Sequence, residues 1–193
     1  MTGARFILFD AAGDGWPKVR YPQVAFAGRS NVGKSSLLNA LVGSAGLARV
    51  SRTPGRTRGI AFFEVEGRYA FADLPGYGYA KVSREEREAW KGLVEGYFDS
   101  CRRLRRVYLL VDVRRGPGEE ERSLAAYLAE RRIPHRWVGT KADKLTPRER
   151  RDAEARFAAG EGLETAGTPV FVSARTKEGI DRLWRDIRAA FSA

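Results

Sequence analysis

The chain has 193 residues, 43% of them hydrophobic and 11% aromatic, which is enough to bury a globular core and excludes a disordered chain. Its 35 lysines and arginines outnumber 24 acidic residues, so the formal net charge is +11 and a polyanionic partner is favoured. One cysteine and one histidine exclude an internal disulfide and a metal site built on histidines. No segment approaches the roughly 20 apolar residues that span a membrane, so we expect a cytoplasmic protein.

Short apolar runs alternate with amphipathic segments along the chain. This alternation predicts an α/β fold in three layers, with a mostly parallel central sheet and helices on both faces. The turn at 66–68 joins two strand-like runs, so we expect a hairpin there and one antiparallel strand. The predicted strands are 5–9, 24–27, 60–65, 69–72, 107–113, 136–139 and 169–172, and the predicted helices are 35–42, 83–100, 117–131, 147–159 and 176–190.

Two of the predicted helices begin with capping boxes. Ser83 is followed by Glu86, and Thr146 by Glu149, so each pair can satisfy two backbone N–H groups at a helix start. No linker or repeat interrupts the pattern, so residues 1–193 are predicted to form a single domain in which 1–21 are a short N-terminal extension. The first of these helices has an apolar stripe that we expect to be buried: Ala89, Trp90, Leu93, Val94, Tyr97 and Phe98.

The segment from Gly28 to Ser35 reads G-x-x-x-x-G-K-S, which is a phosphate-binding loop. It follows the predicted strand 24–27 and opens the next helix, so backbone N–H groups and the positive end of the helix dipole face a bound phosphate. In such a loop Lys34 binds the outer phosphates and the Ser35 hydroxyl ligates magnesium. The motif predicts a nucleotide with magnesium, without specifying the base.

Three further motifs follow predicted strands. Asp73 and Gly76 form D-x-x-G, in which the carboxylate can hold magnesium through a water and the glycine N–H can bond the terminal phosphate. The segment 140–143 reads T-K-x-D, and Asp143 can accept two hydrogen bonds that guanine donates and adenine does not. A backbone N–H in the S-A pair at 173–174 can bond guanine O6. Since ligands bind at the carboxyl ends of strands in open α/β sheets, these motifs predict one guanine-nucleotide site.

On these motifs the chain resembles the TrmE-Era-EngA-EngB-septin-like P-loop GTPases, and within them the EngB (YihA/YsxC) family of ribosome-assembly GTPases. The closer resemblance rests on GRSNVGKSSLLNAL, SRTPGRTRG, DLPGYGYAKV and TKADKL, and it covers nearly the whole chain. It implies a G domain that binds GTP and GDP with Mg²⁺ and hydrolyses GTP to GDP and phosphate at a low intrinsic rate.

The same resemblance implies roles for individual residues. It assigns catalysis to Lys34, Thr57 and Gly76. It assigns direct magnesium ligation to Ser35 and Thr57, with Asp73 in the outer shell, while Thr53 competes with Thr57 for its role. The nucleotide contacts that it implies come from Gly28, Arg29, Ser30, Asn31, Val32, Gly33, Lys34, Ser35, Ser36, Pro54, Gly55, Arg56, Thr57, Asp73, Leu74, Pro75, Gly76, Thr140, Lys141, Ala142, Asp143, Val172, Ser173 and Ala174.

Several positions bear on the rate of hydrolysis. Tyr77 stands where many GTPases carry a glutamine that orients water, so we expect slow hydrolysis until another group or a partner completes the site. Asn31 stands where related GTPases bind potassium, which implies a K⁺ ion beside the phosphates; a role only in shaping the loop is an equal alternative. Arg56 and Arg58 could serve as internal arginine fingers; rRNA contacts and a solvated loop are equal alternatives.

The surplus charge is mostly arginine, which binds phosphate through paired N–H groups and stacks on bases. Many arginines alternate with glutamates on predicted helices and can pair with them instead. The resemblance implies a switch that binds a precursor of the large ribosomal subunit through rRNA and ribosomal proteins, and that supports cell division and septation through growth; the charge is compatible with this partner. A single domain without heptads favours a monomer. The alternatives are a P-loop phosphotransferase and a GTP-dependent membrane or cytoskeletal protein.

Overall fold

The structure, a computed structural model, describes residues 3–11, 19–44, 46–47, 59–78, 83–158 and 168–192. A short 3-10 helix, η3 (Ala142–Lys144), lies among the larger elements. The strands are β1 (Ala4–Asp10), β2 (Gln23–Gly28), β3 (Ile60–Val65), β4 (Tyr69–Asp73), β5 (Leu104–Asp112), β6 (His135–Thr140) and β7 (Val170–Phe171). The α-helices are α1 (Lys34–Val42), α2 (Arg84–Ser100), α3 (Glu119–Glu130), α4 (Pro147–Ala158) and α5 (Ile180–Ser192).

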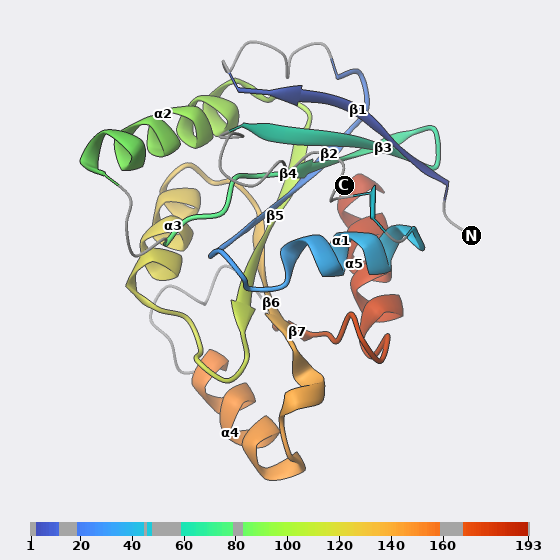
Figure 1. The fold of residues 1–193 in the computed structure, drawn as a ribbon, viewed down its shortest axis with the longest axis vertical. Helices are drawn as coiled ribbons and strands as arrows, with labels where there is room; N and C mark the ends of the chain where they lie inside the picture. The colour runs from blue at the N-terminus through green and yellow to red at the C-terminus, as the bar shows by residue number, and fades with distance from the viewer. Residues whose placement is uncertain are drawn as a thin grey trace.

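The strands form one sheet in the order β1-β3-β4-β2-β5-β6-β7 (Figure 1). β3 runs antiparallel to both of its neighbours, and the other paired strands are parallel. The hairpin from β3 to β4 turns at Glu66 and Gly67, whose φ angles are 55° and 67°. Positive φ at both central residues matches the right-handed twist of a hairpin, which is why the chain reverses here. The predicted hairpin and the single antiparallel strand are confirmed.

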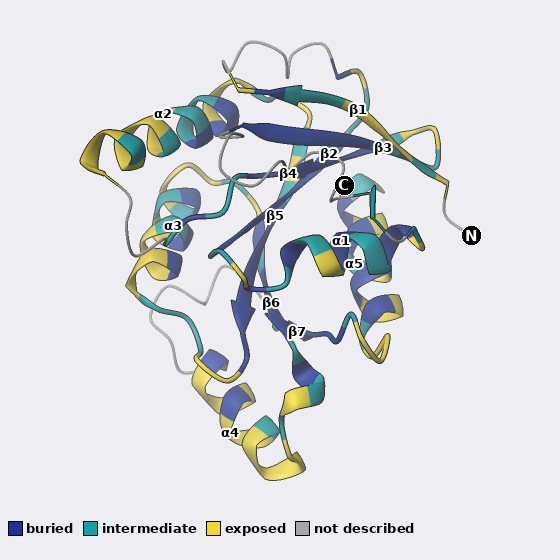
Figure 2. Cartoon of the chain, viewed as in Figure 1, coloured by how far each residue is buried: buried dark blue, intermediate teal, exposed yellow. Residues whose placement is uncertain are grey.

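Helices cover both faces of the sheet. Figure 1 shows α2 and α3 on one side and α1 and α5 on the other. Two buried clusters fill these interfaces, with Tyr97 and Phe157 in the first and Leu37 and Leu183 in the second. All six residues of β2 are buried, and Figure 2 shows the inner strands as mostly buried, whereas the edge strand β1 is mostly intermediate or exposed. A strand that is buried on both faces reads as an apolar run, as parallel strands usually do. The predicted three-layer α/β fold is therefore confirmed.

Both predicted capping boxes form. The Glu86 N–H donates to Ser83 Oγ at 3.2 Å, and the Ser83 N–H donates to the Glu86 carboxylate at 3.2 Å. At the start of α4, the Thr146 N–H donates to the Glu149 carboxylate at 2.8 Å, and the Glu149 N–H donates to Thr146 Oγ1 at 3.3 Å. These local hydrogen bonds explain why the two helix starts are predictable from sequence.

Other boundaries differ from the prediction. α3 begins at Glu119 rather than at 117, because Gly118 is extended and its N–H donates to the Glu121 carboxylate at 2.9 Å. α5 begins at Ile180 rather than at 176, because Lys177 and Gly179 adopt positive φ angles of 67° and 72°, which no α-helix accommodates.

The predicted apolar stripe of α2 is buried only in part. Val94, Tyr97 and Phe98 are buried, Trp90 and Leu93 are half-buried, and Ala89 is exposed. In the ranges that the structure covers, no helix is both long enough and apolar enough to cross a membrane.

Candidate nucleotide-binding site

The phosphate-loop sequence lies between β2 and α1. Gly28 ends β2, and a Cβ atom there would come within 2.9 Å of Val32 Cγ1 and 3.1 Å of the Leu110 carbonyl oxygen, so the close approach requires glycine. Gly33 has φ 102° and directly precedes the first residue of α1. The loop therefore directs the N-terminus of α1, whose first backbone N–H groups have no acceptor within the helix, toward the carboxyl edge of the sheet.

Lys34 is buried and joins the loop to the neighbouring strand. Its ammonium donates to the Leu74 carbonyl at 2.6 Å and forms an ion pair with the Asp73 carboxylate. Asp73 is the last residue of β4 and is 1% exposed. Ser35 follows Lys34 and is half-buried. A hydroxyl and a carboxylate are hard oxygen donors of the kind that Mg²⁺ prefers, so this donor set fits the predicted ion.

The D-x-x-G segment contacts the phosphate loop directly. The Ser30 N–H donates to the Tyr77 carbonyl at 2.8 Å, and a Cβ atom on Gly76 would lie 3.1 Å from Ser30 Oγ. On the other side, Trp90 Nε1 of α2 donates to the Pro75 carbonyl at 2.8 Å. The start of the predicted second switch therefore lies between the phosphate loop and α2, in hydrogen-bond contact with both.

Tyr77 does not present its side chain as a water-orienting group. It is 9% exposed, and its ring packs edge-on against Trp90 at a centroid distance of 5.3 Å. Burial, together with the carboxylates of Glu120 and Glu121, raises the pKa of Tyr77, and its hydroxyl has no hydrogen-bond partner among the described residues. The side chain anchors the segment to α2, and its hydroxyl stays neutral.

The T-K-x-D segment forms the end of β6 and η3. Asp143 Oδ1 accepts from Ser173 Oγ at 2.8 Å, and Oδ2 accepts from Arg175 Nε at 3.0 Å. The bond from Ser173 lowers the pKa of Asp143, so the carboxylate stays ionised at neutral pH. The Ala142 N–H donates to the Val172 carbonyl at 3.1 Å, which joins this segment to the S-A segment.

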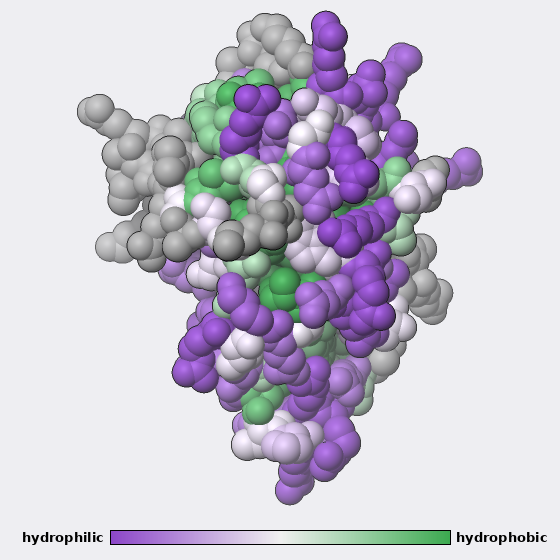
Figure 3. All heavy atoms as spheres, turned by 90° about the vertical axis from the view of Figure 1, so that its right-hand side faces the viewer, coloured by the Kyte–Doolittle hydropathy of each residue, from purple (hydrophilic) through white to green (hydrophobic). Residues whose placement is uncertain are grey.

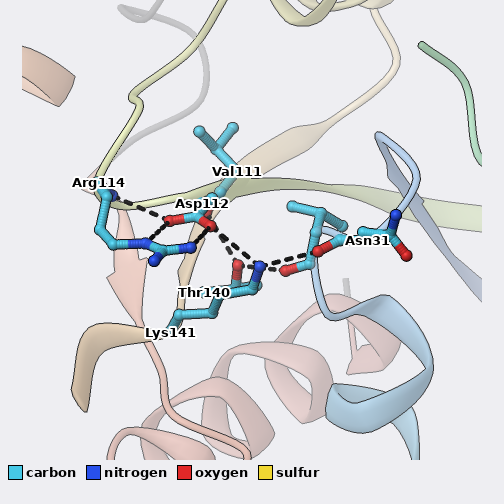
Figure 4. Close-up of polar contacts among 7 residues, drawn as sticks. Asn31, Val111, Asp112, Arg114, Thr140 and Lys141 are labelled. Carbon is cyan, nitrogen blue, oxygen red and sulfur yellow. Dashed lines mark hydrogen bonds and ion pairs between the residues drawn. The ribbon is translucent and has the colours of Figure 1, made fainter. Parts of the chain in front are cut away.

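A polar network joins the same segment to the phosphate loop (Figure 4). Lys141 Nζ donates to the Asn31 carbonyl at 2.8 Å and lies 3.0 Å from Asp112 Oδ2. Thr140 Oγ1 lies 2.7 Å from the Val32 carbonyl oxygen and 3.2 Å from that of Val111. These contacts fix the phosphate loop relative to β5 and β6.

Asp112, the last residue of β5, is the centre of this network. The Arg114 guanidinium donates to it twice, from Nε to Oδ1 at 2.9 Å and from its terminal nitrogen to Oδ2 at 2.6 Å, and the Arg114 backbone N–H donates to Oδ1 at 3.1 Å (Figure 4). Burial alone would raise the pKa of Asp112, but the hydrogen bonds from Arg114 and Lys141 outweigh it, so the pKa lies below its ordinary range. The carboxylate is thus a permanent anchor for Lys141.

A pocket of about 190 Å³ opens between these segments. Its lining includes seven of the predicted contact residues: Gly33, Ser36, Thr140, Lys141, Asp143, Val172 and Ala174. It also includes Leu37, Lys144 and Arg175, which were not predicted as site residues. Asp112 and Arg114 were missed as well. Asp112 is a polar residue at the carboxyl end of an apolar strand, a signal that Asp73 also carries.

Some predicted residues lie outside the described part of the chain. These are the first-switch residues Pro54, Gly55, Arg56 and Thr57, with Thr53 and Arg58 beside them. The described residues nevertheless bring together the phosphate loop, the D-x-x-G aspartate, the T-K-x-D carboxylate and the S-A segment at one edge of the sheet. A phosphate-binding loop with a carboxylate that can read guanine defines the class of P-loop GTPases.

Comparisons with known proteins agree with this class. A family model described as 50S ribosome-binding GTPase matches residues 23–141. A probable GTP-binding protein EngB from Anaeromyxobacter sp. (strain Fw109-5) is 46% identical over 184 residues, which cover 91% of this chain and 85% of that protein. The corresponding protein of Syntrophotalea carbinolica is 44% identical, with 100% and 92% covered. A crystal structure of a probable GTP-binding protein EngB matches with a TM-score of 0.72 and 26% identity, over 88% of this chain and 98% of that one.

The chain belongs to the EngB family of GTP-binding proteins. Its reaction is the hydrolysis of GTP to GDP and phosphate, and its fold is that of the P-loop GTPases.

Proposed function

We propose that this GTPase is a cytoplasmic switch in the assembly of the large ribosomal subunit, and that it supports cell division and septation through growth. In this proposal residues 1–193 act as one G domain and as a monomer, and the partner is a precursor of the large subunit with its rRNA and ribosomal proteins. The partner is supported by the description of the matching family and by the net charge of +11. Membership of a GTPase family favours the switch over a phosphotransferase.

The main observation in support of a nucleotide-dependent switch is the hydrogen bond from the Ser30 N–H to the Tyr77 carbonyl. It joins the phosphate loop to the residue that follows Gly76, whose N–H we assign to the terminal phosphate. A change at this phosphate therefore acts on a segment that Trp90 also holds to α2 through the Pro75 carbonyl. In G proteins such a segment becomes ordered when GTP binds and is released when GTP is hydrolysed, and this change signals the nucleotide state.

Ser35, Asp73 and Thr57 are the residues that we propose to hold Mg²⁺, with Asp73 acting through a water. When bound, the ion neutralises charge on the β- and γ-phosphates. Lys34 adds a positive charge at the same phosphates, and the N–H groups at the start of α1 donate to them. Thr57 lies outside the described residues, so its part in this site rests on the resemblance.

Asn31 is the residue that we propose to bind K⁺ beside the phosphates. Its carbonyl accepts from Lys141, which fixes the backbone, while its side-chain amide points away from Lys141 (Figure 4). GTP turnover should then be faster in potassium than in sodium salts, and Asn31→Ala should remove the difference. Equal turnover of the native protein in the two salts would exclude the potassium site.

A substitution at Tyr77 tests whether its hydroxyl takes part in GTP hydrolysis. Because the hydroxyl is buried against Trp90, Tyr77→Phe should leave basal turnover unchanged and the fold intact. Measured under single-turnover conditions, loss of turnover in Tyr77→Phe would show that the hydroxyl takes part in the reaction.

The experiment that tests the proposed function is sedimentation with purified large and small ribosomal subunits. The protein is loaded with GDP or with a non-hydrolysable GTP analogue, at low and at moderate salt. Binding to the large subunit that requires the analogue and survives moderate salt is the expected result. Binding that ignores the nucleotide and disappears with salt would contradict an assembly switch and leave only electrostatic adhesion to RNA.

A further inference from the structure

Exposed arginines gather where three neighbouring parallel strands begin. β2, β5 and β6 are adjacent and parallel, so their first residues lie along one edge of the sheet. Backbone hydrogen bonds join the segments before them: the Gln23 N–H donates to the Arg103 carbonyl at 2.8 Å, and the Val107 N–H donates to the Pro134 carbonyl at 2.9 Å. The segments that enter these strands, together with the start of β5, carry six exposed arginines, which we call the arginine rim: Arg20, Arg102, Arg103, Arg105, Arg131 and Arg132.

Most of this charge is not compensated within the described protein. Arg131 lies 3.0 Å from the Asp99 carboxylate and 4.0 Å from that of Glu130, and its guanidinium lies over the Tyr127 ring at 3.8 Å. The other five arginines of the rim form no ion pair with any residue that the structure describes. The C-terminal ends of α2 and α3 each add about half a negative charge, so helix dipoles offset about one positive charge and leave a surplus.

The rim lies at the edge opposite to the nucleotide pocket. The pocket is built from the carboxyl ends of the strands, whereas the rim lies at the amino ends of β2, β5 and β6. A large partner can therefore cover the rim while the nucleotide pocket stays open to solvent.

We propose that the arginine rim docks this protein on the sugar-phosphate backbone of RNA, an inference that rests on the RNA partner in the proposed function. Every cation in the rim is an arginine, whose planar guanidinium binds phosphate oxygens through two N–H groups and can stack on a base. Contacts of this kind position a protein on RNA without reading its sequence.

Anionic lipid is the competing polyanion, and the apolar surface argues against it. A helix or patch that lies in a membrane interface combines cations with exposed large apolar side chains. In the described chain the exposed large apolar residues are Phe6 and Ile7 of β1. Two strands, β3 and β4, separate β1 from β2, so these side chains do not belong to the rim.

The test uses the full chain and measures binding of a fluorescent oligouridylate by anisotropy over a range of salt concentrations. The rim variant replaces Arg102, Arg103 and Arg105 with glutamine. The control variant replaces three arginines of α4 and α5 that form no ion pair in the described structure, and so loses the same charge. Figure 3 shows the mostly hydrophilic side of the molecule that carries α5. The control positions are Arg151, Arg182 and Arg185.

If each of the three replaced arginines binds one phosphate, the rim variant should have a slope of log affinity against log salt that is shallower by about 2. Its affinity at about 0.1 M salt should be about 100-fold lower than that of the native protein. The control variant should keep most of its affinity, and both variants should bind GDP like the native protein. If both variants lose the same affinity for oligouridylate, RNA binding depends on total charge rather than on the rim, and the proposal is wrong. Should the triple variant misfold, Arg20→Gln with Arg132→Gln should still lower affinity about 25-fold, and no loss would overturn the proposal.

Two further experiments distinguish RNA binding by the rim from lipid binding, and the rim from the proposed function. The first uses vesicles of phosphatidylcholine and phosphatidylserine. If they bind the native protein but not the rim variant, and RNA binding is unchanged in the variant, the partner of the rim is lipid and the proposal is wrong.

Sedimentation with large ribosomal subunits distinguishes the rim from the proposed function. If the native protein binds oligouridylate through the rim but no subunit in any nucleotide state, the proposed function fails and the rim stands. If the rim variant binds subunits like the native protein, the rim fails and the proposed function stands.

Discussion

The two edges of the same parallel strands carry positive charge in different ways. At the carboxyl edge three cations of the nucleotide site are paired: Lys34 with Asp73, Lys141 with Asp112, and Arg175 with Asp143. At the amino edge five of the six arginines of the rim form no ion pair within the described chain. Both edges are rich in lysine or arginine, so composition alone does not distinguish them.

The difference separates two uses of charge. A small ligand is held by groups whose positions are fixed before it arrives, and carboxylates fix Lys34 and Lys141 in this way. A large polyanion is attracted by the summed field of unpaired charges, which do not need exact positions. We therefore expect substitutions at the carboxyl edge to change nucleotide affinity or stability, and substitutions of the unpaired arginines of the rim to change neither.

Asp143→Asn should have the largest effect. The amide replaces an acceptor with a donor opposite a guanine donor, and two hydrogen bonds to a charged group contribute about 4 kcal/mol, so GDP affinity should fall about 1000-fold. Xanthosine diphosphate, which has a carbonyl at C2, should bind the variant better than GDP does. Calorimetric titration with both nucleotides measures this, with Asp181→Asn on α5 as control. GDP affinity that stays native in Asp143→Asn would show that this carboxylate does not read the base.

Lys34→Met should have the next largest effect, on stability. It removes the ammonium beside the buried Asp73 carboxylate and should cost about 3 kcal/mol, which lowers Tm by roughly 6–12 °C in a chain of this length. Adding Asp73→Asn should recover part of the loss, because the second variant removes the buried charge. Thermal unfolding without nucleotide measures both. The triple glutamine variant of the rim should change stability by less than about 0.5 kcal/mol, and a larger loss there would break the contrast between the edges.

Asp112→Ala should weaken nucleotide binding by a smaller factor. It releases Lys141 from one of its two anchors, and the loss of one such hydrogen bond corresponds to about tenfold in GDP affinity. Asp112→Glu should restore part of the affinity, because a carboxylate is kept. Glu154→Ala, which removes an exposed partner of Arg150, is the matched control. Equal affinities for Asp112→Ala and the control would mean that the network in Figure 4 does not support the site.

His135 should have the smallest effect, at the amino edge. It is 4% exposed at the start of β6, and burial lowers its pKa below the ordinary value of 6.5. The unfolded chain therefore binds a proton more readily than the folded one, so stability is full above about pH 6.5 and falls as the pH drops from there toward the folded pKa. Urea unfolding at about pH 7.5 and about pH 5.5 should show a smaller fall for His135→Gln than for the native protein. An unchanged pH dependence would assign the fall to other groups.

The phosphate loop and the guanine-reading segment were predictable because each is local. Eight consecutive residues supply the glycines, the lysine and the hydroxyl of the loop, and its backbone N–H groups belong to the same segment. The same holds for the capping boxes at Ser83 and Thr146, whose hydrogen bonds span three residues. Strand and helix order followed from periodicity, although the start of α5 was placed four residues too early because the positive φ of Lys177 leaves no periodic signal.

By itself the sequence determined the fold class, the nucleotide-binding motifs and the excess of positive charge. Only the tertiary structure decided that Asp112 anchors Lys141, that Tyr77 is buried against Trp90, and that the unpaired arginines gather at the amino edge. The reason is physical. Motifs and caps depend on hydrogen bonds between near neighbours in the chain, whereas these contacts join segments that only the order of strands in the sheet and the packing of helices against it bring together.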